Sequence, residues 1–175
     1  MEMLGVAELV IRPARGEERV DPALEPPQLV MALAEAKARE AAAEERSGDV
    51  VIAADTIVVY DGRVYGKPHD GAEAAEMLRT LSGRTHEVYT GVCVIRNGNA
   101  LCRADRSAVS FRPLSEREIE RYVACGEPLD KAGAYGAQGK GALFVEKIEG
   151  DFFNVMGLPL CMLGEMLKEQ GVELL

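Results

Sequence analysis

The sequence has few of the residues that hold structural metal ions or build disulfide frameworks. It contains two histidines, no tryptophan and four cysteines, which are Cys93, Cys102, Cys125 and Cys161. The cysteines are scattered and include no Cys-x-x-Cys pair, whereas zinc sites and disulfide-rich domains depend on such spacing. We therefore expect neither a structural zinc ion nor a disulfide framework.

Long apolar runs are also missing. No stretch approaches the ~20 residues that span a bilayer, and the first residues lack the basic and apolar regions of a signal peptide. Hydrophobic residues make up 47% of the 175 residues and charged residues 28%, which is typical of a globular protein. These features predict a cytoplasmic protein that does not bind membranes, with one domain or two small lobes around a cleft.

Positive charge is scarce, because 29 Asp and Glu residues outnumber 20 Lys and Arg residues and give a net charge of −9. Affinity for nucleic acid comes mainly from neutralising phosphates. We therefore expect no nucleic acid polymer as a partner. A few Lys and Arg in a cleft can still hold a small anion locally, particularly with a divalent cation as co-ligand.

The segment Val50–Tyr60 is rich in Val and Ile, which predicts a strand buried on both faces. Asp55 lies in its middle. A carboxylate there loses water on folding, so it must be paired, hydrogen-bonded, bound to a cation or neutral. This position indicates a site of chemistry. The alternative is that Asp55 caps a neighbouring helix or marks an exposed end of the strand.

A tight turn is predicted directly after this strand. Asp61-Gly62 tolerates the positive φ of two-residue hairpins, so residues 63–65 are expected to return as a short strand. Lys67 then precedes Pro68, which keeps its backbone extended. The hairpin can bring the Lys67 ammonium towards Asp55. The more common role of a single lysine is a solvated position in a loop.

The rest of the chain alternates helices and strands, which predicts a mixed-sheet α/β domain. A lysine at Lys37 lies beside the apolar stripe of the first long helix, where most lysines extend to solvent. Arg84 precedes a strand, at a position where open sheets often bind ligands. The expected helices cover residues 26–46, 71–81, 115–125 and 160–170, after the last turn of another at 1–5; the expected strands cover 6–11, 50–60, 63–65, 87–96, 101–111 and 143–148.

The twelve residues from Asp130 to Gly141 include four glycines. Such a segment lets backbone N–H groups approach an anion closely, and the side chain of Gln138 offers both a donor and an acceptor. The segment does not match a Walker loop, because Gly141 rather than Ser or Thr follows Lys140. A flexible surface loop and a binding loop remain equally compatible with this composition.

Several ordered motifs resemble the Maf family of nucleoside triphosphate pyrophosphatases, and together they cover nearly the whole chain from Leu33 onward. They are Leu33-Ala34-x-x-Lys37-Ala38, Ala54-Asp55-Thr56, Gly66-Lys67-Pro68, Leu81-Ser82-Gly83-Arg84-Thr85-His86, Asp130-Lys131-Ala132-Gly133-Ala134-Tyr135-Gly136, Gln138-Gly139 and Gly157-Leu158-Pro159. The resemblance implies a mixed, twisted sheet with flanking helices and a cleft between two lobes, similar to inosine triphosphatases. It also implies a homodimer and, for the family, an association with septum formation.

The activity implied by the resemblance is hydrolysis of a nucleoside triphosphate to the monophosphate and pyrophosphate with Mg²⁺ or Mn²⁺. Asp55 would accept a proton from water and help to hold the metal, while Lys37 and the catalytic Lys67 would contact phosphates. Thr56 and Gln138 match positions typical of dTTP/UTP pyrophosphatases, as opposed to enzymes acting on 7-methyl-GTP. Arg84, in the matching motif, is predicted to bind substrate.

The sequence departs from the family pattern at its start. The family opens with a strand followed by Ser-x-Ser-Pro-Arg-Arg, and this sequence has no such segment. We therefore expect residues 1–175 to form a single Maf-like domain without that first strand and phosphate loop. The alternatives to an active pyrophosphatase are a non-catalytic nucleotide-binding module, inactive through truncation, and a different enzyme such as a phosphatase or nucleotidyl transferase. A smaller departure lies at Asp21-Pro22 and Pro27-Gln28, where the family often carries acidic residues that could assist metal binding.

Overall fold

The computed structural model describes residue 6 and residues 8–13, 23–43 and 48–174. Its helices are α1 (Pro26–Ala42), α2 (Gly71–Leu81), α3 (Glu116–Ala124), α4 (Phe152–Val155) and α5 (Leu160–Glu169). Its strands are β1 (Val50–Tyr60), β2 (Arg63–Tyr65), β3 (Thr85–Arg96), β4 (Asn99–Phe111) and β5 (Val145–Glu149). Three short 3₁₀ helices, η2 (Glu127–Asp130), η3 (Ala132–Ala134) and η4 (Lys140–Leu143), occupy most of the segment between α3 and β5.

The strands form one sheet in the order β2-β1-β3-β4-β5, and each described pairing is antiparallel. Two tight hairpin turns connect four of them, the predicted one at Asp61-Gly62 and a second at Asn97-Gly98. Asp61 and Asn97 both have φ of 50°, and a glycine with positive φ follows each. Such residues match the right-handed twist of the flanking strands. The predicted α/β architecture is thus confirmed, although the described part of the sheet is antiparallel rather than mixed. The two locally encoded turns account for the neighbouring pairs β1-β2 and β3-β4.

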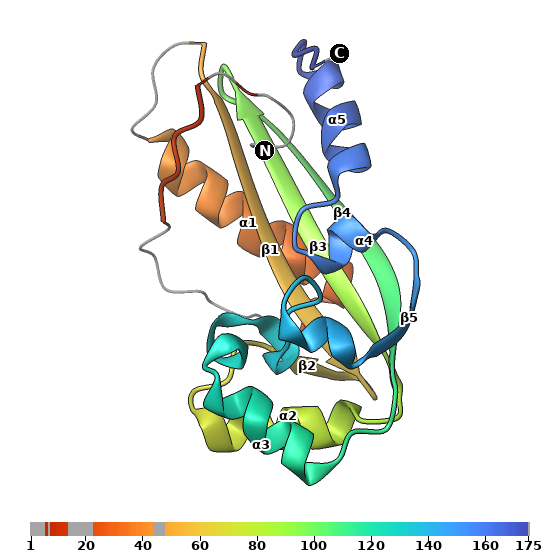
Figure 1. The fold of residues 1–175 in the computed structure, drawn as a ribbon. Helices are drawn as coiled ribbons and strands as arrows, with labels where there is room; N and C mark the ends of the chain where they lie inside the picture. The colour runs from red at the N-terminus through yellow and green to blue at the C-terminus, as the bar shows by residue number, and fades with distance from the viewer. Residues whose placement is uncertain (1–5, 7, 14–22, 44–47, 175) are drawn as a thin grey trace.

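β1 is paired unevenly along its length. β3 pairs with residues 50–59 of β1, whereas the short β2 pairs only with residues 58–60. Within the described parts of the chain, the first half of β1 therefore has a strand on one side and none on the other. This open edge lies in the middle of the molecule, where helices approach from both faces of the sheet (Figure 1).

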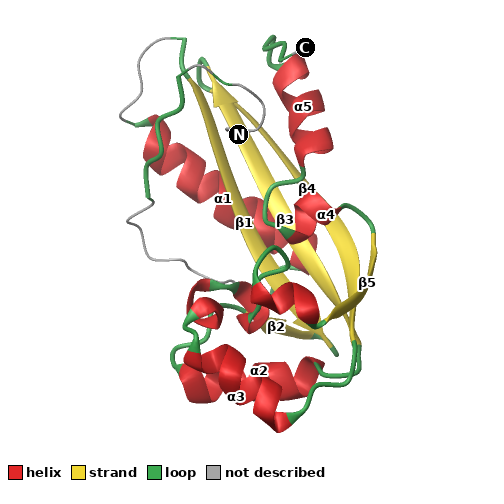
Figure 2. Ribbon diagram, viewed as in Figure 1, coloured by secondary structure: helices red, strands yellow, loops and turns green. Residues whose placement is uncertain are grey.

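The two faces of the sheet are covered by different helices (Figure 2). α1 packs on one face, where Ile57 and Val59 of β1 join its Leu29, Val30 and Leu33 in a buried cluster. α5 packs on the other face, against Val92 and Val94 of β3. Side chains alternate along a strand, so odd-numbered residues of β1 face α1 and even-numbered residues face the other layer. β1 is thus covered on both faces, as predicted, but only Val51 and residues 57–59 are fully buried and the rest of the strand is partly exposed.

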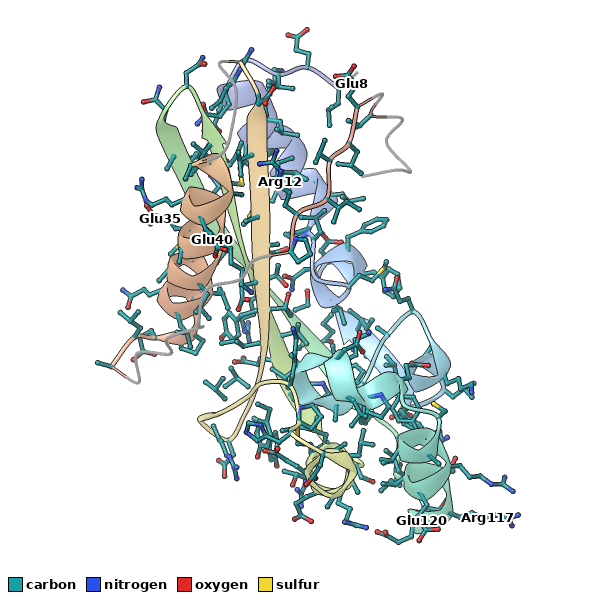
Figure 3. The ribbon with its side chains drawn as sticks, turned by 90° about the vertical axis from the view of Figure 1, so that its left-hand side faces the viewer. Glu8, Arg12, Glu35, Glu40, Arg117 and Glu120 are labelled. Atoms are coloured by element: carbon teal, nitrogen blue, oxygen red, sulfur yellow. The ribbon has the colours of Figure 1, made fainter. Side chains whose placement is uncertain are left out.

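A second lobe forms around α2 and α3 at one end of the sheet. Its core contains Phe111, Tyr135 and Phe144, whose rings meet edge to face at 4.7 and 6.1 Å between centroids. Arg117 and Glu120 project outward from α3, at the opposite end of the molecule from Glu8 (Figure 3). The charged outer face and buried inner face of α3 are what an amphipathic surface helix requires.

Some predicted elements differ from the structure. The strand expected at 6–11 is wrong: its described residues follow an irregular path, and Val10 and Ile11 are 74% and 78% exposed. None of the described strands pairs with them. The expected helical turn at 1–5 lies outside the described residues. α1 ends at Ala42 rather than at residue 46. The strand expected from residue 143 begins at Val145 because η4 occupies Lys140–Leu143.

The short helix α4 follows β5. α4 was not predicted; Asp151 begins it by accepting a hydrogen bond from the backbone N–H of Phe153 at 2.8 Å. Among the described residues, no helix combines the length and the apolar character needed to cross a lipid bilayer.

Candidate active site

A pocket of about 470 Å³ opens at the unpaired edge of β1. This size is typical of a site for a small organic ligand. Residues from α1, the middle of β1, the segment after β2, the glycine-rich segment and the end of α4 line it. The pocket reaches both faces of the sheet because no described strand covers that edge of β1.

An ion pair lies in this pocket. The Lys37 ammonium donates a hydrogen bond to Asp55 Oδ1, and the two side chains are 22% and 9% exposed. Lys37 belongs to α1 and Asp55 to β1, so the contact joins helix and sheet. The pairing satisfies the requirement that a carboxylate removed from water has a partner, and it leaves both charges at the wall of a cavity.

Gly91 of β3 explains how α1 comes so close to Asp55. Gly91 is paired with Asp55 in the sheet. A Cβ atom at this position would lie 2.2 Å from the carbonyl oxygen of Val30 in α1, so only glycine allows the helix backbone to approach. A glycine inside a strand is the sequence signal for such a close approach, although we did not predict its role.

Lys67 reaches the pocket from the segment after β2. The backbone N–H of Gly133 donates to the carbonyl oxygen of Gly66 at 3.0 Å, which ties this segment to the glycine-rich one. Lys131 donates to Asp130 at 2.7 Å, and this bond lowers the pKa of Asp130 below its usual value, with a smaller contribution from Lys67. Lysines from both segments therefore border the same opening.

Thr56 and Gln138 also line the pocket. Thr56 follows Asp55 and faces the opposite side of the sheet, where its Oγ1 lies 2.8 Å from Oγ1 of Thr90. Gln138 is an exposed residue of the glycine-rich segment. Thr56 therefore lies on the side of the pocket away from α1, and both it and Gln138 offer neutral polar side chains to the pocket.

Glu127 organises the glycine-rich segment. Its carboxylate accepts hydrogen bonds from the backbone N–H groups of Lys140 and Gly141 at 3.0 and 3.2 Å, and from the Tyr122 hydroxyl at 2.9 Å. Burial alone would raise the pKa of Glu127, but these bonds outweigh it and hold the pKa below its usual value. Tyr122 in turn accepts from the N–H of Gly136. The segment is an ordered wall rather than a loose surface loop, and the sequence did not reveal this role of Glu127.

Arg84 is the one predicted site residue that the structure does not bring to the pocket. Its guanidinium is exposed, donates to the carbonyl oxygen of Thr80 at 2.6 Å and lies 5.6 Å from the ring centre of Tyr60. The other five, Asp55, Lys67, Lys37, Thr56 and Gln138, line one cavity.

The described residues contain no group of three or more His, Cys, Asp or Glu side chains that could hold a metal ion. Asp55 and Asp130 are the carboxylates among the pocket-lining residues. Mg²⁺ is usually held by one or two carboxylates together with waters and substrate phosphates. The pocket therefore fits a metal ion that binds together with a phosphate ligand, and does not fit a cage made by the described residues alone.

Comparison with known proteins gives a consistent result. The family model described as "Maf-like protein" matches residues 1–170. A dTTP/UTP pyrophosphatase of Bacillus mycoides (strain KBAB4) is 52% identical over 153 residues, which cover 87% of this chain and 80% of that protein. One of Bacillus cereus (strain AH820) is 47% identical over 174 residues, which cover 99% of this chain and 90% of that protein. The predicted family is confirmed: this chain belongs to the Maf family.

Proposed function

We propose that this protein hydrolyses dTTP and UTP between the α and β phosphates, releasing the monophosphate and pyrophosphate. The observation that carries the proposal is the pairing of Asp55 with Lys37 in a pocket that also contains Lys67, Thr56 and Gln138. The names of the relatives, dTTP/UTP pyrophosphatase, agree with this activity.

Asp55 is the proposed general base. It is a largely buried carboxylate at the wall of the cavity, so a water molecule beside it can lose a proton as it attacks the α-phosphorus. Lys37 balances the charge of Asp55 while the pocket contains no triphosphate. A triphosphate supplies a second anion for the same ammonium, and the flexible side chain of Lys37 can contact either.

Lys67 is the proposed contact for the departing pyrophosphate. Cleavage places negative charge on the bridging and leaving oxygens, and an ammonium held there stabilises the transition state. Its position on the rim of the pocket suits a polyphosphate tail that extends towards solvent. Arg84 is outside this proposal because it lies away from the cavity.

A divalent cation, Mg²⁺ or Mn²⁺, is part of the proposal. Asp55 would hold this cation, which would supply positive charge to offset the negative charge that develops on the phosphate oxygens. Thr56 and Gln138 would contact the base, since both are neutral side chains that line the pocket and carry donors and acceptors. We also propose a homodimer in the cytoplasm; this rests on the family resemblance, and sedimentation analysis of the purified protein tests the dimer.

The deciding experiment is a product-resolved assay with dTTP, UTP, CTP, GTP and 7-methyl-GTP in the presence of Mg²⁺ or Mn²⁺. We expect pyrophosphate and the monophosphate from dTTP and UTP, and little product after addition of a chelator. Release of orthophosphate, or transfer of a nucleotide, would instead indicate another enzyme class. Tight binding of UTP without turnover of any nucleotide would indicate a nucleotide-binding module.

A further inference from the structure

A chain of hydrogen bonds runs from Thr56 into the layer that covers the face of the sheet opposite α1. Thr90 of β3 is paired with Thr56 in the sheet and is fully buried. Its Oγ1 lies 2.8 Å from Thr56 Oγ1 and 2.9 Å from the carbonyl oxygen of Asn154 in α4. The Thr90 hydroxyl therefore has two oxygen neighbours at hydrogen-bond distance.

The direction of these bonds follows from the number of protons. A hydroxyl carries one hydrogen, and a carbonyl oxygen only accepts. Both contacts are hydrogen bonds only if Thr90 donates to Asn154 and Thr56 donates to Thr90. The opposite direction would leave two oxygens facing each other at 2.9 Å without a proton, in a buried place where an unsatisfied polar atom is costly.

The accepting end of this chain is held in place. The Asn154 side chain is fully buried and donates to the carbonyl oxygen of Val88 at 3.1 Å and to Oγ of Ser107 at 2.9 Å. The carbonyl oxygen of Asn154 also accepts from the N–H of Gly157 at 2.9 Å, which its two lone pairs permit. The carbonyl group cannot turn away without breaking several hydrogen bonds. The fold therefore fixes the direction in which the hydrogen bonds from Thr56 to Thr90 and from Thr90 to Asn154 are donated.

At the other end, Thr56 Oγ1 lies beside Gly157, and both residues line the pocket. A Cβ atom on Gly157 would come within 3.3 Å of Thr56 Oγ1, so the missing side chain keeps the space beside the hydroxyl open. The proton of Thr56 is committed to Thr90. Only lone pairs of its oxygen are left for a ligand.

We propose that Thr90 is a positioning residue that makes Thr56 a hydrogen-bond acceptor towards the nucleobase and thereby selects bases with an N–H at the ring atom that Thr56 contacts. This inference rests on the proposed function and concerns how the same pocket chooses its substrate. Uracil and thymine carry a proton on N3, whereas the N3 of cytosine carries a lone pair. The fixed acceptor favours UTP and dTTP and repels CTP, although the three bases have nearly the same shape.

The test compares Thr90→Val, which removes the hydroxyl at nearly constant volume, with Thr90→Ser, which keeps it. A matched control is Thr85→Val, because Thr85 lies on the same strand in a similar contact, 2.8 Å from Oγ of Ser110, and does not line the pocket. The ratio of kcat/KM for UTP to that for CTP is measured for each protein. Binding of UMP and CMP by calorimetry gives the same comparison without catalysis.

In Thr90→Val the Thr56 hydroxyl is free to rotate and to donate, so it can pair with either base. The preference for uridine over cytidine should therefore fall roughly tenfold, which corresponds to about 1.4 kcal/mol. Thr90→Ser and Thr85→Val should keep the wild-type ratio. If Thr90→Val does not fold, Thr90→Cys replaces it, because a thiol fills the space but donates weakly.

Two results would overturn the inference: an unchanged ratio in the variant without the hydroxyl, or a wild-type protein that binds UMP and CMP equally and turns over UTP and CTP equally. Preferred binding of UMP without hydrolysis of any triphosphate would instead overturn the proposed activity. The role of Thr90 would then be decided by the binding ratio alone.

Discussion

The two faces of β1 differ most at two consecutive residues. Asp55 points towards α1 and meets the ammonium of Lys37, whereas Thr56 points towards α4 and meets the hydroxyl of Thr90. Both line the same pocket because the described part of the sheet ends at this stretch of β1. Because side chains alternate along β1, the charged pair lies on one face of the strand and the neutral hydroxyls lie on the other, within one site.

This separation suits a nucleotide, whose phosphates are anionic and whose base is neutral. A charged pair acts at some distance and tolerates variation in geometry. A hydroxyl discriminates through the direction of one bond. The comparison predicts that substitutions on the α1 face change the rate for all substrates, and that substitutions on the α4 face change the choice among them.

The largest expected effect is on the charged face. Asp55→Asn keeps the size of the side chain and removes the basic oxygen, so we expect kcat to fall roughly 10²-fold or more, as for loss of a general base, while the UTP to CTP ratio stays the same. Steady-state kinetics with pyrophosphate detection measure both quantities. Turnover close to that of the wild type would rule out Asp55 as the base.

A buried histidine should make the other face sensitive to acid. His86 of β3 is 1% exposed, its Nε2 lies 2.8 Å from the Tyr135 hydroxyl, and burial lowers its pKa to about 4. As the pH falls, His86 therefore takes up a proton at a lower pH in the folded protein than in the unfolded chain. The stability that depends on neutral His86 is complete above the unfolded pKa of about 6.5 and is lost as the pH falls towards 4.

Because of His86 alone, the free energy of unfolding should be about 2 kcal/mol smaller at pH 5 than at pH 7. Urea unfolding of the wild type and of His86→Gln at pH 7, 6 and 5 measures the loss. Carboxylates contribute equally in both proteins, so the difference between them reports His86. Equal pH dependence in the two proteins would show that this histidine is not held neutral by the fold.

A smaller effect is expected at the neutral end of the comparison. Thr56→Val removes the hydroxyl from the pocket, so the ratio of kcat/KM for UTP to that for CTP should fall roughly tenfold, while kcat for UTP changes less than in Asp55→Asn. The same kinetic assay with both substrates gives these values. If kcat of Thr56→Val fell as much as that of Asp55→Asn, the two faces of β1 would not have the separate roles in rate and in base selection that we expect.

Local sequence signals predicted most of the fold, but not the contacts that complete the site. Asp61-Gly62 and Asn97-Gly98 encode their turns within four residues, and the structure has both hairpins. Asp70, a residue type that favours helix N-caps, begins α2 by accepting a hydrogen bond from the backbone N–H of Glu73 at 2.8 Å. The strand expected at 6–11 failed because apolar composition does not supply a neighbouring strand.

The features that were missed depend on residues far apart in the chain. Gly91 matters because the backbone of α1 crosses it, Glu127 because it holds Lys140 and Gly141, and Thr90 because α4 supplies a carbonyl group. None of these partners is visible in the local pattern. The grouping of five predicted residues around one pocket could be expected because a family resemblance carries tertiary information that composition and periodicity lack. The roles of these residues stay predictions.

Substitution of Arg84 has the smallest expected effect. The family resemblance predicts that Arg84 binds substrate, whereas the structure places its side chain away from the pocket. Arg84 and Lys67 are exposed cations of the same lobe, but only Lys67 lines the pocket. Because the Arg84 guanidinium lies against Tyr60 and the carbonyl oxygen of Thr80, Arg84→Gln should change kcat/KM for UTP by no more than about twofold, as for an ordinary surface position. Lys67→Gln is the matched control and should lower it roughly tenfold or more. A comparable loss in both variants would mean that Arg84 moves to the phosphates when the nucleotide binds, and the lobe that carries α2 would then have to close over the substrate.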